Sequence, residues 1–149
     1  MDASVSPPSS SPVVIRLERT PCLGTCPVYK LEVRADGSWL LGGWYPRKGC
    51  ARGTLAGADL ASLLSMARST GYMSLKASYT LPVTDLPSVD TEVTLDGKTK
   101  AVHHYGNGRD PAEKSLAAFE QAIDQTVDTK MALAGPLGTC GPKGPYGLP

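Results

Sequence analysis

The fold is decided by one stretch of the sequence, Arg19-Thr20-Pro21-Cys22-Leu23-Gly24-Thr25-Cys26-Pro27-Val28-Tyr29. It contains two cysteines with three residues between them, one of which is glycine, and a proline on either side of the pair. Proline fixes its own φ angle and glycine accepts positive φ, so we expect this stretch to form a rigid bend. The flanking runs 13–19 and 28–34 alternate apolar and polar residues, which predicts two strands joined by the bend.

The residues after the second strand predict a hairpin and then a helix. Asp36-Gly37 is typical of a tight turn and predicts a returning strand over 38–44. Residues 46–53, which carry Cys50, are interpreted as a basic, glycine-containing connection. A helical spacing of apolar residues then predicts a helix that ends at Gly71, with its buried stripe formed by Leu60, Leu63, Leu64 and Ala67.

The second half of the chain follows the same order. Residues 75–87 show no periodicity and are expected to form a loop. Residues 89–95 and 98–105 predict a second hairpin, because each alternates and a turn sequence separates them. A second helix is expected to begin after Asp110, its N-cap, and to end at Gly135-Pro136.

This order of elements predicts an α+β fold, an antiparallel sheet built from two β-hairpin units with two helices packed on one face. The 149-residue chain is long enough for one hydrophobic core. We expect a single domain over residues 13–134. A Pro/Ser-rich extended tail would precede it over residues 1–12, and a Gly/Pro-rich tail would follow over residues 135–149.

Composition argues against some partners and leaves the compartment open. Fifteen Lys and Arg balance 14 Asp and Glu without clustering, which argues against nucleic acid or an anionic membrane as the main partner. No apolar run is long enough for a transmembrane segment. The protein would be cytoplasmic if Met1 is the natural start, and periplasmic or extracellular if a presequence was removed.

The cysteine pair is the first candidate site. Cys22 and Cys26 could form a structural disulfide, and closing so short a loop would stabilise the fold by about 2 kcal/mol. They could instead be a redox pair or metal ligands, and the Cys-x-x-x-Cys-Pro pattern resembles that of copper-delivery proteins. His104 could join them to bind copper or zinc, with Cys50 as a fourth ligand. Its neighbour His103 would point to the other face of the strand, so only one of the two histidines could take part.

Two further arrangements are weaker candidates. A Cys–His pair oriented by Asp85 could support hydrolysis, but no nucleophile-elbow or protease motif accompanies it, and we assign no catalytic residue. Thr84 and Asp85 are expected to stabilise their own loop through side-chain hydrogen bonds. An ion pair between Asp85 and Arg19 would tie that loop to the bend.

The bend resembles the signature of an uncharacterised bacterial family catalogued only as a domain of unknown function, Arg-Thr-Pro-Cys-Phe-Gly-Thr-Cys-Pro-x-Tyr. Here Leu23 replaces the aromatic residue. Further similarities span about residues 13–128 and include Asp36-Gly37, Gly71-Tyr72, Thr84-Asp85-Leu86-Pro87, Asp96-Gly97-Lys98 and Tyr105-Gly106. The resemblance implies the fold and places Arg19, Thr84, Asp85 and Tyr105 in shared loops, but it implies no chemistry. Members of the family often look exported or lipid-anchored, which would suit an oxidised Cys22–Cys26 pair.

We therefore expect a non-catalytic binding or accessory domain without a cofactor. It would meet a protein partner, or a larger assembly, through its surface and extended tails. The alternatives are thiol–disulfide or copper and zinc handling by Cys22 and Cys26, and hydrolysis by a Cys–His pair.

Overall fold

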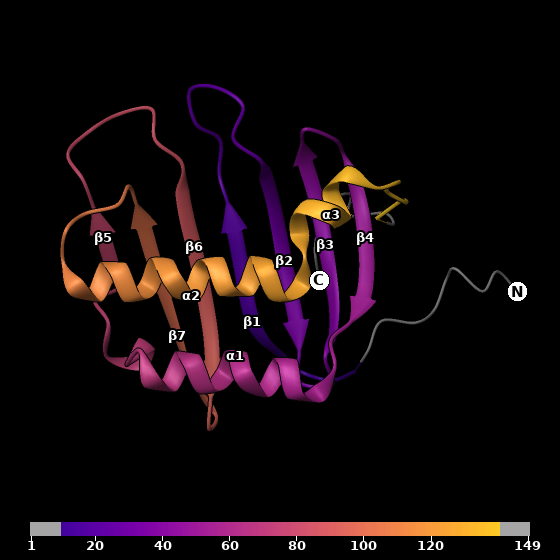
Figure 1. Cartoon of the computed structure of the whole chain (residues 1–149), viewed down its shortest axis with the longest axis horizontal. Coiled ribbons are helices and arrows are strands. Elements are labelled where there is room, and N and C mark those ends of the chain that lie inside the picture. The colour runs from indigo at the N-terminus through magenta and orange to yellow at the C-terminus, as the bar shows by residue number, and fades with distance from the viewer. Residues whose placement is uncertain (1–9, 141–149) are drawn as a thin grey trace, which may run out of the picture.

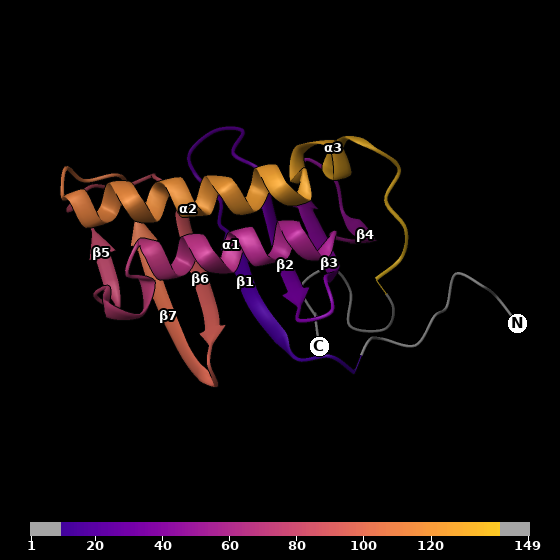
Figure 2. The same ribbon diagram turned by 60° about the horizontal axis from the view of Figure 1, so that its bottom comes forward.

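The computed structural model describes residues 10–140, which form a seven-stranded sheet with helices on one face (Figure 1). Seen closer to edge-on, α1 and α2 lie side by side as one layer over the sheet (Figure 2). The strands are β1 (Val13–Arg19), β2 (Val28–Arg34), β3 (Ser38–Tyr45), β4 (Gly49–Thr54), β5 (Ser78–Thr80), β6 (Ser88–Leu95) and β7 (Lys98–Tyr105). The helices are α1 (Gly57–Ser69), the short 3-10 helix η1 (Tyr72–Ser74), α2 (Pro111–Val127) and α3 (Thr129–Ala134).

The sheet is mixed, with strand order β4-β3-β2-β1-β6-β7-β5. Strand β1 lies at its centre, between β2 and β6, and all neighbours are antiparallel except β5 and β7. The α+β class is thus confirmed, and both predicted hairpins are present. The prediction of a wholly antiparallel sheet is wrong, because β5 runs parallel to β7 at one edge.

Two edge strands were predicted as irregular chain. Strand β4 occupies most of the stretch interpreted as a connection, and it pairs with β3 from Ser38↔Thr54 to Gly43↔Gly49. Its sequence Gly-Cys-Ala-Arg-Gly-Thr has no apolar alternation, because the pairing with β3, and not burial of one face, defines it. Strand β5 has only three residues, too few for any period to be detected.

The predicted second helix is broken in two. Helix α2 begins as expected, with the Asp110 carboxylate accepting a hydrogen bond from the N–H of Ala112. It ends at Asp128, which adopts the left-handed conformation with φ 62°. The same Asp128 then caps α3 by accepting from the N–H of Met131, so one residue ends one helix and begins the next.

The core lies between the helices and one face of the sheet. Alternation along β1 and β2 directs Ile15, Leu17, Leu31 and Val33 toward the helices, and all are 1% exposed or less. The largest side chain in this core is Tyr72, which keeps its hydroxyl satisfied at 2.7 Å from Thr91 Oγ1. The other large core side chains that are less than 2% exposed are those of Leu41, Val93, Val102, Leu116, Phe119 and Ile123.

Register brings three connections to the same end of the sheet. Arg19 pairs with Tyr29 and Val89, and Val28 pairs with Tyr45, so β1 and β3 end where β2 and β6 begin. We call this region, residues 20–27, 44–48 and 81–87, the loop end; it lies at the top of Figure 1. Among residues 10–140, no helix is long and apolar enough to cross a membrane.

Candidate functional site

The cysteine bend forms the centre of the loop end. Cys22 and Cys26 are joined by a disulfide with their Cα atoms 5.7 Å apart, and both residues are half-buried. The N–H of Leu23 donates to the carbonyl of Asp85 at 3.1 Å, and the N–H of Thr20 donates to the carbonyl of Ser88 at 3.1 Å. The bend and the 81–87 loop are therefore held together as one surface.

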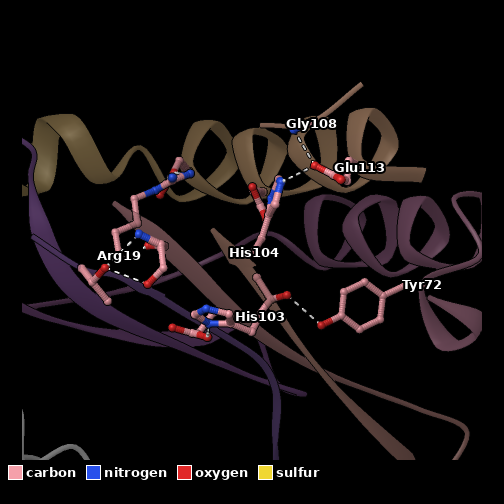
Figure 3. Close-up of polar contacts among 12 residues, drawn as sticks. Arg19, Tyr72, His103, His104, Gly108 and Glu113 are labelled. Atoms are coloured by element: carbon pink, nitrogen blue, oxygen red, sulfur yellow. Dashed lines mark hydrogen bonds and ion pairs between the residues drawn. The ribbon is translucent and has the colours of Figure 1, made fainter. Parts of the chain in front are cut away.

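The prediction of an ion pair between Arg19 and Asp85 is wrong. Arg19 instead donates from Nε and Nη2 to Asp124 Oδ2 of α2, at 2.9 and 2.6 Å (Figure 3). The Asp124 carboxylate also accepts from the hydroxyls of Tyr29 at 2.5 Å and Thr129 at 2.9 Å. Arg19 points toward the helix layer because it shares the face of Ile15 and Leu17, whereas Asp85 lies in a loop beyond the sheet.

This network holds the bend against the helices. Burial raises the pKa of the Tyr29 hydroxyl, and the negative charge of Asp124 raises that pKa further. Burial alone would lower the pKa of Arg19, but Asp124 and Tyr29 raise it by more, so the net shift is upward. The cluster thus combines one cation, one anion and two neutral hydroxyls, and joins β1 and β2 to α2 and α3.

Exposed apolar side chains gather at the loop end. Within residues 10–140, six large hydrophobic residues are exposed, and Leu23 is the most exposed at 80%. Five of the six lie in the loop end; they are Leu23, Trp44, Tyr45, Val83 and Leu86. The sixth, Met131, lies on α3, whose last carbonyls accept hydrogen bonds from Arg47 of the loop end. The exposed large hydrophobic residues of the described chain are therefore concentrated at one end of the sheet.

Two shallow hollows lie on the sheet face opposite the helices. The first, of about 320 Å³, adjoins the loop end and is lined by Glu18, Thr20, Pro21, Val28 and Trp44. The second, of about 290 Å³, lies further along β1 and is lined mainly by charged side chains. Glu18 lines both, so the hollows meet at this residue.

The two histidines lie on opposite faces of β7, as alternation predicts. His103 is 43% exposed and binds Asp90 Oδ1 through Nδ1 at 2.5 Å. His104 is 2% exposed and lies under α2, where Nδ1 is 2.8 Å from Glu120 Oε2 (Figure 3). Its Nε2 makes no hydrogen bond and is 3.6 Å from Glu113 Oε2, which accepts the N–H of Gly108. His104 is thus a buried charge partner of two carboxylates.

The free energy of unfolding is expected to decrease as the pH rises above neutrality, because His104 loses its proton. The hydrogen bond that His104 donates to Glu120 raises the pKa of His104; burial opposes this shift, and the charges of Glu120 and Glu113 add to it. A raised pKa stabilises the fold below the unfolded value of about 6.5, and the stabilisation is lost as the pH passes the folded value. A charged hydrogen bond of this kind contributes about 2 kcal/mol. Urea unfolding from pH 5.5 to 9 would measure the effect.

A variant of His104 separates it from other titrating groups. His104→Gln keeps a hydrogen-bond donor for the glutamates but cannot change its charge, so its stability should vary less over this range. If the variant followed the parent curve, His104 would not be the group that titrates.

Cys50 is bonded to Cys140, so all four cysteines are paired and none is a free thiol in this form. Cys22, Cys26 and His104 are not brought together, and the described residues contain no cluster of three or more His, Cys, Asp or Glu side chains suited to a metal. Thr84 Oγ1 donates to Asp85 Oδ2 at 3.4 Å, and Tyr105 accepts the N–H of Leu86 through its hydroxyl at 3.2 Å.

Several residues of the site were not identified from sequence. Asp124, Glu113 and Glu120 occur among other polar residues of a helix and carry no local motif. One available signal was helical spacing: Glu120 lies one position from Phe119 and four from Leu116, at the border of the buried stripe. Trp44 follows Gly42 and Gly43 near the end of β3, where alternation weakens and the exposure of a side chain could not be predicted.

A family model described as "Domain of unknown function (DUF6438)" matches residues 13–127. The match begins at β1 and ends at the last residue of α2, so α3 and Cys140 lie outside it. It includes the bend, the 81–87 loop and both hollows. No curated protein matches the chain.

Proposed function

Since the chain belongs to the DUF6438 family of domains of unknown function, we propose its function from its own geometry: it is a non-catalytic binding module that meets a protein partner through the loop end. The proposal rests on one observation, the gathering of five of the six exposed large hydrophobic residues of the described chain into this region. Contiguous exposed apolar surface is costly in water, and large patches of it mark interaction sites.

The construction of the loop end supports this proposal. A binding surface loses less entropy on association when its loops are already ordered. The Cys22–Cys26 disulfide constrains the bend, and the hydrogen bond between Leu23 and Asp85 fixes the bend to the neighbouring loop. Leu23, at the tip of the bend, would be the first apolar side chain to contact a partner.

The two disulfides support an oxidising compartment as the place where this binding occurs. Disulfides persist outside the cytosol and are rare in reducing compartments. We therefore propose the periplasm or the extracellular space. An accessory module was also expected to contact its partner through tails over residues 1–12 and 135–149. Residues 1–9 and 141–149 of these tails lie outside the described residues.

A photo-crosslinking amino acid at position 23 tests the proposal. Expressed in the native host with this replacement for Leu23, the chain is expected to form a discrete adduct with one protein on irradiation. The adduct should weaken by about tenfold when Val83 and Leu86 are changed to serine in the same chain, since two apolar contacts of a partner would be lost. Adducts are measured by immunoblot and identified by mass spectrometry.

The matched control places the crosslinker at position 35. Ala35 is exposed in the turn between β2 and β3, at the opposite end of the sheet. It should give no adduct, or a diffuse set of adducts that the Val83 and Leu86 changes do not affect. Equal crosslinking at the two positions would contradict a binding surface at the loop end.

A further inference from the structure

We propose that the sheet face opposite the helices binds an extended, basic segment of the partner protein, laid along β1 with a lysine or arginine between Glu18 and Trp44. The inference rests on the proposed function, because it names the chemistry of the partner that the loop end would meet. It concerns the two hollows on the sheet, which adjoin the loop end and share Trp44 with it, and it can fail separately.

The shape of the surface suits an extended chain. The two hollows meet at Glu18 and follow β1 from Arg16 to Pro21. Along a strand this distance is about 17 Å, which is the length of about five residues of an extended peptide. Together the two hollows form a trough, which opens at the loop end beside Pro21 and Trp44. A segment lying in this trough would continue directly onto the exposed apolar residues.

The charges of the surface select for a basic segment. Four carboxylates line the second hollow or its junction with the first, against the two cations Arg16 and Lys30; they belong to Glu18, Glu32, Asp90 and Glu92. Arg16 is already bound to Glu32 Oε2 at 3.0 Å and to Glu92 Oε1 at 2.6 Å. No ion pair to Glu18 is found within residues 10–140, which leaves its carboxylate available at the point where the hollows meet.

A second carboxylate oxygen is also left without a hydrogen bond. Glu32 is 4% exposed, and its Oε1 atom has no hydrogen-bond partner, although it forms an ion pair with Arg34 Nη2 at 3.8 Å. A buried carboxylate oxygen without a donor is costly, and a donor supplied by a ligand would remove that cost. Both observations favour a ligand that donates hydrogen bonds and carries positive charge.

Trp44 provides the aromatic side of the binding position. The ring already carries a cation of the chain, because Lys48 Nζ lies 4.1 Å from its centroid, so a cation of the partner would take the place of Lys48. A lysine or arginine of the partner could extend its aliphatic part over Val28 and Pro21 and bring its charge to Glu18. An acidic or a neutral segment would gain neither contact.

Selection from a random peptide library tests this inference directly. Yeast-displayed random seven-residue peptides are selected with the folded chain as bait, and the enriched pool is sequenced. Lysine and arginine are expected to rise at least threefold over the starting library at one central position. An enriched peptide should bind Glu18→Gln or Trp44→Ala about tenfold more weakly in fluorescence anisotropy, and the Glu18→Gln loss should shrink in high salt.

Asp59→Asn is the matched control for Glu18→Gln. It removes one exposed carboxylate from the helix layer and changes the net charge equally, so the peptide affinity should stay unchanged. Selection of acidic or uncharged peptides, failure to enrich any peptide, or equal weakening by Glu18→Gln and Asp59→Asn would each overturn the inference. If the selection fails while the crosslink from position 23 forms, the loop end binds a partner and the trough does not take a basic segment.

Discussion

Replacing Asp124 by alanine is expected to lower the free energy of unfolding by about 3 kcal/mol, the largest loss from any single exchange among the polar residues of the site. The carboxylate accepts hydrogen bonds from Arg19, Tyr29 and Thr129, and it is 18% exposed. Without it, a largely buried guanidinium and two hydroxyls lose their acceptor while remaining shielded from water. We place the loss at the low end for a buried pair because the Arg19 side chain is 26% exposed. Urea unfolding at constant m-value measures it.

Asp96→Ala is the control for this exchange. The Arg68–Asp96 pair has similar geometry, with contacts of 2.7 and 3.1 Å, but its side chains are 53% and 73% exposed. Exposed pairs are screened by water, so this variant should unfold close to the parent. A double-mutant cycle of Asp124→Ala with Tyr29→Phe should show coupling, because both changes remove the same hydrogen bond. Equal effects of Asp124→Ala and Asp96→Ala would show that burial does not decide the contribution.

In the same network, the strands and the helix could be predicted from the sequence, but the contact between them could not. Periodicity predicted the strands that hold Arg19 and Tyr29 and the helix that holds Asp124, because burial of one face imposes a repeat on the sequence. It could not predict that Arg19 would bind Asp124 and not Asp85. That choice depends on which face of the sheet the helix covers and on the helix rotation, and both follow from long-range packing.

The candidate site was predicted in part for a related reason. The bend at Cys22 and Cys26 could be recognised because its prolines and glycine constrain the backbone locally. The exposure of Leu23 and Trp44, and the pairing of Cys50 with Cys140, depend on contacts between residues far apart in the chain. The short strand β5 and the left-handed Asp128 were missed because each occupies too few residues for any repeat to register.

The two disulfides are expected to differ in what they stabilise, and removal of Cys50–Cys140 should have the larger effect on stability. The chain-entropy model relates stabilisation to the number of residues in the closed loop. For the 90-residue separation of Cys50 and Cys140, the double exchange to serine should lower the free energy of unfolding by about 4–5 kcal/mol. The paired hydrogen bonds between Cys50 and Gly138, at 2.8 Å each, should be lost with it. Urea unfolding without reductant measures the change.

Removal of Cys22–Cys26 is the matched comparison, because the separation there is only four residues and the same model gives about 2 kcal/mol. The order of the two losses tests the model, since similar losses would mean that loop length does not govern them.

The short disulfide should matter more for binding. It constrains the loop that carries Leu23, so its removal should weaken the crosslink from position 23 in a chain that remains folded. The Cys50–Cys140 variant, compared at a temperature where it too is folded, should keep that crosslink, because β4 and residue 140 lie outside the bend. If removal of the long disulfide weakened the crosslink and removal of the short one did not, the partner would contact the region around β4. That result would contradict a binding surface at the loop end.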